Sequence, residues 1–176
     1  MSLNIGVVMD PIAQIKPWKD TTLAMLLEAQ RRGWALHYME PADLYVRDGR
    51  VFAVTSDLTV RDDNQDWFTL GEPAPRDLTG MDMILMRQDP PFDAAYLYAT
   101  YLLEKVEREG VLVANRPASV RDSNEKLFAT DFPQCCVPTL VSGRAALLRE
   151  FVKEQGDTVM KPLDAMGGTN VFRIEP

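Results

Sequence analysis

The sequence predicts an α/β fold, with a doubly wound and mostly parallel sheet followed by the beginning of a second domain. Short apolar runs rich in valine, isoleucine and methionine alternate with segments whose leucines recur at helical spacing. Near the C-terminus, two further apolar runs flank a Gly-Gly turn. The first pattern is typical of βαβ units, and the second predicts a separate hairpin.

The first βαβ unit is expected within the first forty residues. Residues 3–9 form an apolar run without alternation, which predicts a strand buried on both faces. Asp20 is suited to cap a helix whose leucines line one face, and Gly33 is placed to end it. Residues 35–39 then predict the second strand.

An antiparallel excursion is expected next, before the sheet resumes. Residues 44–70 alternate around Arg-Asp-Gly-Arg, which is typical of a tight hairpin turn. Residues 83–86 and 111–114 predict two more buried strands. Between them, Asp93 should cap a helix that Gly110 ends.

The rest of the chain predicts the start of a second domain. Residues 119–128 are expected to form a short helical segment, and residues 132–141 a connector that contains proline. Ser142 is expected to cap a helix that ends at Gly156. The side chains expected to point inward from that helix are Leu147, Leu148, Phe151 and Val152. A strand-loop-strand follows, so we predict domains at residues 1–122 and 123–176.

Composition excludes several classes of function. The net charge is −7 and the sequence has no basic stripe, which argues against non-specific binding to nucleic acid. No apolar run is long enough to span a membrane. No basic-then-apolar leader opens the sequence, so the cytoplasm is the expected compartment. The single histidine, His37, lies in an apolar run without nearby ligand or triad residues, which favours a structural role.

Polar loops follow the predicted parallel strands. Asp10, Pro11 and Ile12 come directly after the first strand, and Arg87 ends another. Ligands of doubly wound sheets bind at the carboxyl ends of the strands, so these residues are candidates for substrate binding. The guanidinium of Arg87 suits a carboxylate, but an ion pair with Asp89 or Asp93 explains it equally well.

The C-terminal hairpin is a candidate phosphate site. Lys161 follows an apolar strand, and Gly167 and Gly168 free the backbone to approach an anion closely. A lysine before a proline and a glycine turn also occur in hairpins that bind nothing, so the local pattern leaves both readings open.

Five segments in order resemble prokaryotic glutathione synthetase, from about residue 3 to the end of the chain. They are Val8-Met-Asp-Pro-Ile, Met86-Arg-Gln-Asp-Pro-Pro-Phe-Asp, Ala99-Thr-Tyr-Leu-Leu-Glu, Arg121-Asp-Ser-Asn-Glu-Lys and Lys161-Pro-Leu-Asp-Ala-Met-Gly-Gly. Another ATP-grasp ligase, such as D-alanine-D-alanine ligase, would share the hairpin and lysines but is not expected to carry the first two segments.

The resemblance implies an ATP-grasp ligase that joins γ-glutamylcysteine to glycine through an acyl phosphate, with ATP and Mg²⁺. It implies a pre-ATP-grasp domain at residues 1–122, the start of an ATP-grasp domain at residues 123–176, and a homotetramer. The residues implied to hold the ATP phosphates are Lys126, Lys161, Gly167, Gly168 and Thr169. Those implied to face the dipeptide are Arg87, Asp10, Pro11 and Ile12.

The sequence departs from the family pattern in two respects. Members of the family continue for about as much chain again, with the metal ligands and the mobile lid, so we expect this chain to be an N-terminal part that is inactive alone. The alternative is a stand-alone, non-catalytic module that binds substrate or a partner. In addition, Ala165 stands where the family usually has glycine, which would strain the loop if that position required a positive φ.

Overall fold

The computed structural model describes residues 2–165 and 167–175, in two compact units, Met1–Val120 and Arg121–Pro176. We call them unit 1 and unit 2. Three residues that belong to the predictions above lie outside the described residues. They are Met166 of the glycine-containing segment, and Met1 and Pro176 at the two ends of the chain.

Unit 1 is a mixed sheet with a parallel half and an antiparallel half. The sheet order is β3-β4-β2-β1-β7-β8, and β5 and β6 also pair with β4. The parallel strands are β1 (Asn4–Met9), β2 (Ala35–Met39), β7 (Met83–Arg87) and β8 (Leu112–Ala114). The antiparallel strands are β3 (Leu44–Arg47), β4 (Arg50–Val60), β5 (Phe68–Leu70) and β6 (Ala74–Asp77).

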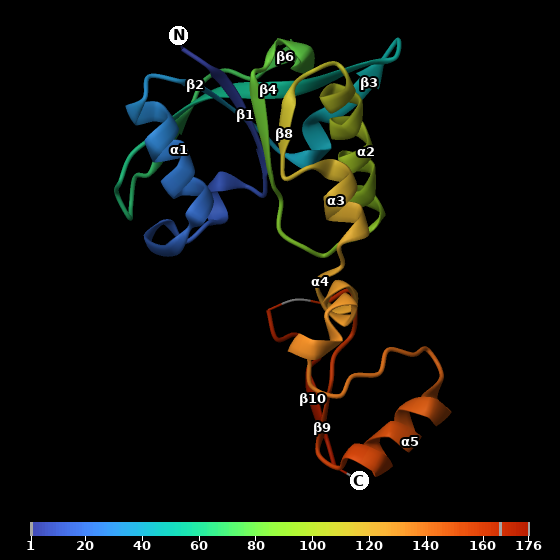
Figure 1. Cartoon of the computed structure of the whole chain (residues 1–176). Coiled ribbons are helices and arrows are strands. Elements are labelled where there is room, and N and C mark those ends of the chain that lie inside the picture. Colours follow the sequence, from blue (N-terminus) through green and yellow to red (C-terminus); the bar gives the residue numbers. More distant parts are fainter. Residues whose placement is uncertain (1, 166, 176) are drawn as a thin grey trace. The chain divides into compact units, whose positions relative to one another are not determined.

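Helices α1 (Thr21–Arg31) and α2 (Ala94–Arg108) cover opposite faces of the parallel half (Figure 1). Two apolar clusters fill the layers between them. One joins Leu23 and Leu26 of α1 to buried side chains on one face of β1. The other joins Leu103 and Val106 of α2 to Val8, on the opposite face of β1. The α/β, doubly wound prediction is therefore confirmed.

Local sequence signals placed these elements correctly. Asp20 and Asp93 accept hydrogen bonds from Leu23 N and Tyr96 N, as expected of caps at the starts of α1 and α2. The predicted hairpin turn joins β3 to β4, with Asp48 and Gly49 at positive φ.

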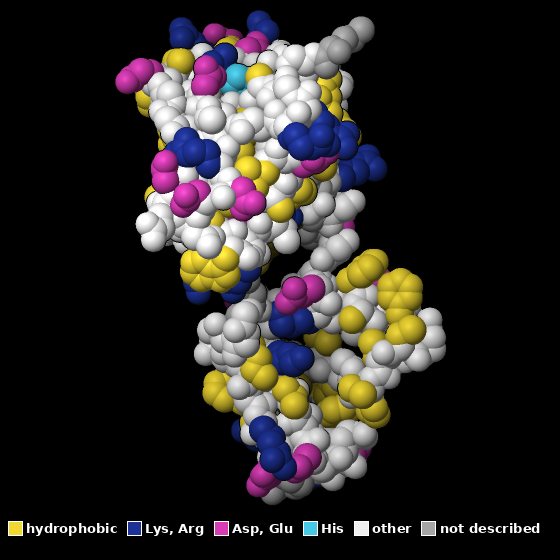
Figure 2. Space-filling model, turned by 90° about the vertical axis from the view of Figure 1, so that its left-hand side faces the viewer, with side chains coloured by type: hydrophobic (Ala, Val, Ile, Leu, Met, Phe, Trp, Pro, Cys, Tyr) yellow, Lys and Arg dark blue, Asp and Glu magenta, His cyan; other side chains and the backbone are white. Residues whose placement is uncertain are grey.

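Unit 2 contains short helices and a two-stranded antiparallel sheet. Helix α3 (Pro117–Asp122) spans the division between the units, and α4 (Glu125–Phe128), α5 (Ala145–Gln155), β9 (Thr158–Met160) and β10 (Phe172–Ile174) follow. None of the described residues of unit 2 is buried. Figure 2 accordingly shows apolar side chains at its surface. Phe128, Phe132 and Val137 are among the exposed apolar residues of this unit.

Two expectations for α5 are wrong. Ser142 does not cap the helix, because its hydroxyl accepts from Arg144 N, two residues on, and Arg144 itself occupies the cap position. Ser142 therefore shapes the turn before the helix instead. The apolar side chains expected to point inward are not fully buried either: Leu148, Phe151 and Val152 are half-buried, and Leu147 is 44% exposed.

Candidate functional site

The carboxyl ends of β1 and β7 bring together the two predicted substrate segments. The chain leaves β1 toward β2 on one side, while β7 pairs with β1 on the other, so the sheet order reverses here. Such a switch point is where doubly wound sheets bind ligands. Met9 pairs with Arg87, and the next residue, Asp10, accepts a 2.7 Å hydrogen bond from Asp89 N. Asp10 and Arg87 therefore lie at the same edge, as predicted.

Among the described residues, Arg87 forms no ion pair with Asp89 or Asp93. Such a pair was the alternative explanation for an arginine at this position, and it is therefore excluded. The Nε of Arg87 donates to Thr22 Oγ1 and its Nη2 to Thr21 Oγ1, both at 3.0 Å. These hydroxyls, at the start of α1, hold one edge of the guanidinium. Nη1 has no partner among the described residues, so it is available to an anion.

Tyr96, on α2, is a member of this cluster that sequence reasoning missed. It is buried, and its hydroxyl donates to the carbonyl of Gln88 at 3.4 Å. Burial raises the pKa of Tyr96, and the negative charges of Asp10 and Asp89 raise that pKa further. The tyrosine thus remains a neutral hydrogen-bonding group beside the strand ends.

The loop after β1 presents its three residues differently. Asp10 and Pro11 are half-buried, whereas the Ile12 side chain is only 2% exposed. The backbone N–H of Ile12 donates to Tyr38 Oη, and its carbonyl accepts from Trp67 Nε1. Both backbone polar groups of Ile12 are therefore hydrogen-bonded within the protein, and its side chain is buried.

In unit 2, four of the predicted phosphate-binding residues lie in the segment between β9 and β10, and the fifth, Lys126, contacts that segment. Lys126, on α4, donates from Nζ to the carbonyl of Ala165 at 2.5 Å and pairs with Glu125 at 2.8 Å. Lys161 directly follows β9, is exposed and has no partner among the described residues. One ammonium is thus docked on the segment, and the other is free.

Gly167 and Gly168 have φ values of 64° and 82°, where a side chain would be strained. Thr169 is exposed beside them. Ala165 is not among the residues with positive φ, so its methyl group carries no backbone penalty, contrary to the concern that the sequence raised. Two ammonium groups and a glycine turn are features that can bind a phosphate group.

Asn124 is a second residue that sequence reasoning missed. Its Oδ1 caps α4 by accepting from Lys126 N and Leu127 N, both at 3.1 Å. Its Nδ2 donates to the carbonyl of Leu163 at 2.9 Å. One amide thus connects the helix that carries Lys126 to the segment that follows Lys161.

Two surface hollows, of about 560 and 290 Å³, contain none of these residues. They lie toward the amino ends of the parallel strands, around Arg50 and Lys105 and around Asn4 and His37. His37 is buried, and Nδ1 lies 3.0 Å from Asp57 Oδ1, a contact that accounts for it structurally. The described residues contain no group of three or more potential metal ligands.

The two parts of the chain match two domains of one enzyme family. The family model of the N-terminal domain of prokaryotic glutathione synthetase matches residues 3–121, and that of its ATP-grasp domain matches residues 125–176. The chain belongs to the prokaryotic glutathione synthetase family. The resemblance inferred from the five segments is confirmed.

Individual relatives agree with this assignment. The glutathione synthetases of Pseudomonas putida and Yersinia pestis are 56% and 53% identical over 173 residues, which is 98% of this chain and 55% and 54% of those proteins. The chain therefore spans about half the length of the curated relatives it matches. Of solved structures, the ATP-grasp ligase PsnB complexed with minimal precursor aligns with 100% of this chain and 58% of its own, at 15% identity and a TM-score of 0.52. That likeness shows the fold.

Proposed function

We propose that this chain provides the substrate-binding domain and the first part of the ATP-grasp domain of a ligase that joins γ-glutamylcysteine to glycine. The observation that carries the proposal is the ordered match of both glutathione synthetase domains, with relatives above 50% identity. In domain terms we propose residues 1–122 and 123–176.

The proposed chemistry is phosphorylation of the cysteinyl carboxylate by ATP, followed by attack of the glycine amine and release of phosphate. Most of the protein's work in such a reaction is positioning and charge neutralisation. The free Nη1 of Arg87 would bind a carboxylate of the dipeptide, while Asp10 would accept from its ammonium group. Both residues lie at the switch point of the sheet.

Phosphate binding is assigned to unit 2. Lys126 and Lys161 would neutralise the ATP phosphates, and the backbone at Gly167, Gly168 and Thr169 would pass close to them. Mg²⁺ would neutralise further phosphate charge when bound with ATP; we assign it no ligand among the described residues. We also assign no catalytic residue here.

We further propose a cytoplasmic homotetramer, which rests on the family resemblance. No helix of the described residues is long and apolar enough to cross a membrane. Tyr98, on α2, is 63% exposed and would suit a subunit contact. Light scattering of the product of the complete reading frame tests this: a monomer at all concentrations would rule out the tetramer.

The test of function is phosphate release that depends on ATP, γ-glutamylcysteine and glycine. The product of the complete reading frame should show it, and the 176-residue chain measured beside it should not. Turnover only with a different amine or dipeptide would show that the proposed substrates are wrong and that the enzyme is an ATP-grasp ligase of another specificity. Absence of turnover with retained γ-glutamylcysteine binding would instead support a non-catalytic module.

A further inference from the structure

The loop that follows β1 is held at Ile12 by two side chains from distant parts of unit 1. The N–H of Ile12 donates to Tyr38 Oη at 3.2 Å, and the carbonyl of Ile12 accepts from Trp67 Nε1 at 3.0 Å. These partners lie 26 and 55 positions along the chain. The Ile12 side chain is buried in the apolar cluster that contains Leu23 and Leu26 of α1. Both backbone groups and the side chain are thus fixed.

Tyr38 is suited to its role because its own proton is already committed. Its hydroxyl donates to Glu40 Oε1 at 2.8 Å, which leaves a lone pair for the N–H of Ile12. Burial raises the pKa of Tyr38 above its usual value of 10, and the hydrogen bond to Glu40 raises that pKa too. The hydroxyl therefore stays protonated across physiological pH, and the contact persists.

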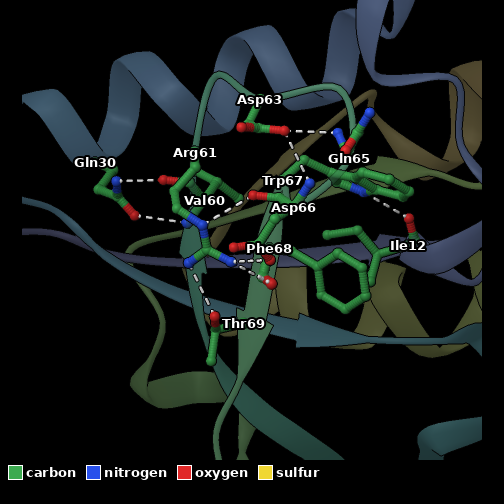
Figure 3. A network of polar contacts seen from close by, with 10 residues as sticks. All are labelled: Ile12, Gln30, Val60, Arg61, Asp63, Gln65, Asp66, Trp67, Phe68 and Thr69. Carbon is green, nitrogen blue, oxygen red and sulfur yellow. Dashed lines mark hydrogen bonds and ion pairs between the residues drawn. The ribbon is translucent and has the colours of Figure 1, made fainter.

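Trp67 is placed by a dense set of contacts at the turn between β4 and β5 (Figure 3). The Arg61 guanidinium donates to the carbonyl and carboxylate of Asp66, to the carbonyl of Phe68 and to Thr69 Oγ1. The backbone N–H of Arg61 also donates to the carbonyl of Trp67 at 2.8 Å. The indole is therefore presented from a turn whose backbone is bound on both sides of it.

The same turn is tied to α1. Gln30 donates to the carbonyl of Val60 and accepts from its N–H, each at 2.8 Å (Figure 3). Helix α1 also carries Thr22, which orients Arg87. The loop after β1 and the Arg87 side chain are consequently held by connected parts of unit 1.

We propose that Trp67 and Tyr38 are positioning residues for the dipeptide. They fix the backbone of Ile12, and through it the orientation of Asp10 and Pro11 toward the edge where Arg87 lies. This inference rests on the proposed function. It makes a distinct claim, that both residues control binding of the dipeptide through the backbone of Ile12.

The test is Trp67→Phe in the product of the complete reading frame, which keeps a ring and removes the indole donor. We expect the KM for γ-glutamylcysteine to rise about tenfold, equivalent to about 1.4 kcal/mol, with the KM for ATP unchanged. Tyr38→Phe should act in the same direction. A merely structural role would lower the amount of active enzyme, and hence kcat, without separating the two KM values.

Trp34→Phe is the matched control. Trp34 is partly buried in the same unit and stacks under Arg32, but its indole donates to none of the described residues. It should leave both KM values unchanged. A Trp67→Phe enzyme with the wild-type KM for the dipeptide would overturn the inference, whereas a wild-type enzyme without activity would overturn the proposed function instead.

Hydrogen exchange gives a readout that needs no substrate. In the 176-residue chain, Tyr38→Phe should speed exchange of the Ile12 amide about tenfold, because that N–H loses its acceptor. Unchanged exchange would show that the tyrosine does not hold the loop, and the inference would fail on that result alone.

Discussion

Lys126 donates from Nζ to the backbone carbonyl of Ala165, 39 positions along the chain, at 2.5 Å. The same ammonium pairs with Glu125, and the side chain is only 21% exposed. The lysine thus stabilises the segment between β9 and β10 and keeps one N–H for a further acceptor. The proposed phosphate ligand is therefore already anchored before any nucleotide binds.

Replacement of Lys126 by alanine should weaken ATP binding roughly ten- to a hundredfold, the range expected for loss of a hydrogen bond to a charged group. Calorimetric titration of the product of the complete reading frame with ATP measures it. Lys153→Ala, on the exposed side of α5, removes the same charge and should have no effect. Equal losses in both variants would mean that only net charge matters.

Asn124 allows its two roles to be separated. Asn124→Asp keeps the oxygen that caps α4 but removes the donor to Leu163, so ATP affinity should fall while the helix persists. Asn124→Ala removes both contacts and should also cost about 1 kcal/mol of stability for the lost cap. Thermal unfolding and ATP titration together distinguish them.

Asn64→Asp, in an exposed turn of unit 1, makes the same chemical change as Asn124→Asp and is its control. It should alter neither quantity. Wild-type ATP affinity in Asn124→Asp would show that the contact with Leu163 does not position the segment.

Arg87 should not tolerate lysine. An ammonium cannot donate to Thr21 and Thr22 and also present a free N–H in the same plane, so Arg87→Lys should weaken γ-glutamylcysteine binding about tenfold or more. Thr22→Val removes one orienting hydroxyl at nearly constant shape and should give a smaller loss. The exposed Arg47→Lys is the comparison, and a dipeptide titration is the measurement. Retained affinity in Arg87→Lys would exclude the proposed role of the free Nη1 in binding the dipeptide.

His37 predicts a pH-dependent stability. Burial lowers the pKa of His37 below its usual 6.5, the positive charge of Arg76 lowers it further, and Asp57 opposes both. As pH falls through 6.5, the unfolded chain binds the proton more readily, so the folded state loses stability, by at most about 1.4 kcal/mol per pH unit. The melting temperature should therefore decrease from pH 7.5 to 5.5.

His37→Gln should flatten this decrease, because the chain has no other histidine to titrate in that window. Carboxylates contribute equally to both proteins, so the difference between the two profiles isolates the imidazole. An unchanged slope in His37→Gln would assign the pH dependence to another group.

Local chemistry made much of unit 1 predictable from sequence. Asp20, Asp93 and the Asp48-Gly49 turn each act through bonds to near neighbours, so their patterns specify the element directly. Strand β6 was not predicted, because Pro75 is typical of a loop. Proline is tolerated where a strand pairs on one side, and β6 pairs only with β4.

The supports of the candidate site could not be predicted for a different reason. Trp67, Tyr38 and Asn124 contact backbone groups 26 to 55 positions away, and no periodic pattern encodes such pairs. The sequence identified residues with unusual chemistry, such as Arg87 and Lys126. Which edge of each side chain stays free depends on partners that only the folded chain brings close.

The sheet of unit 1 has a consequence for biosynthesis. All eight of its strands lie between Asn4 and Ala114, and β4 pairs with four of them. Once that stretch has left the ribosome, every partner of β4 is present, and the sheet needs nothing that is translated later. We expect unit 1 to fold while unit 2 is still being synthesised, so that its apolar strands are covered before the exposed apolar side chains of unit 2 emerge.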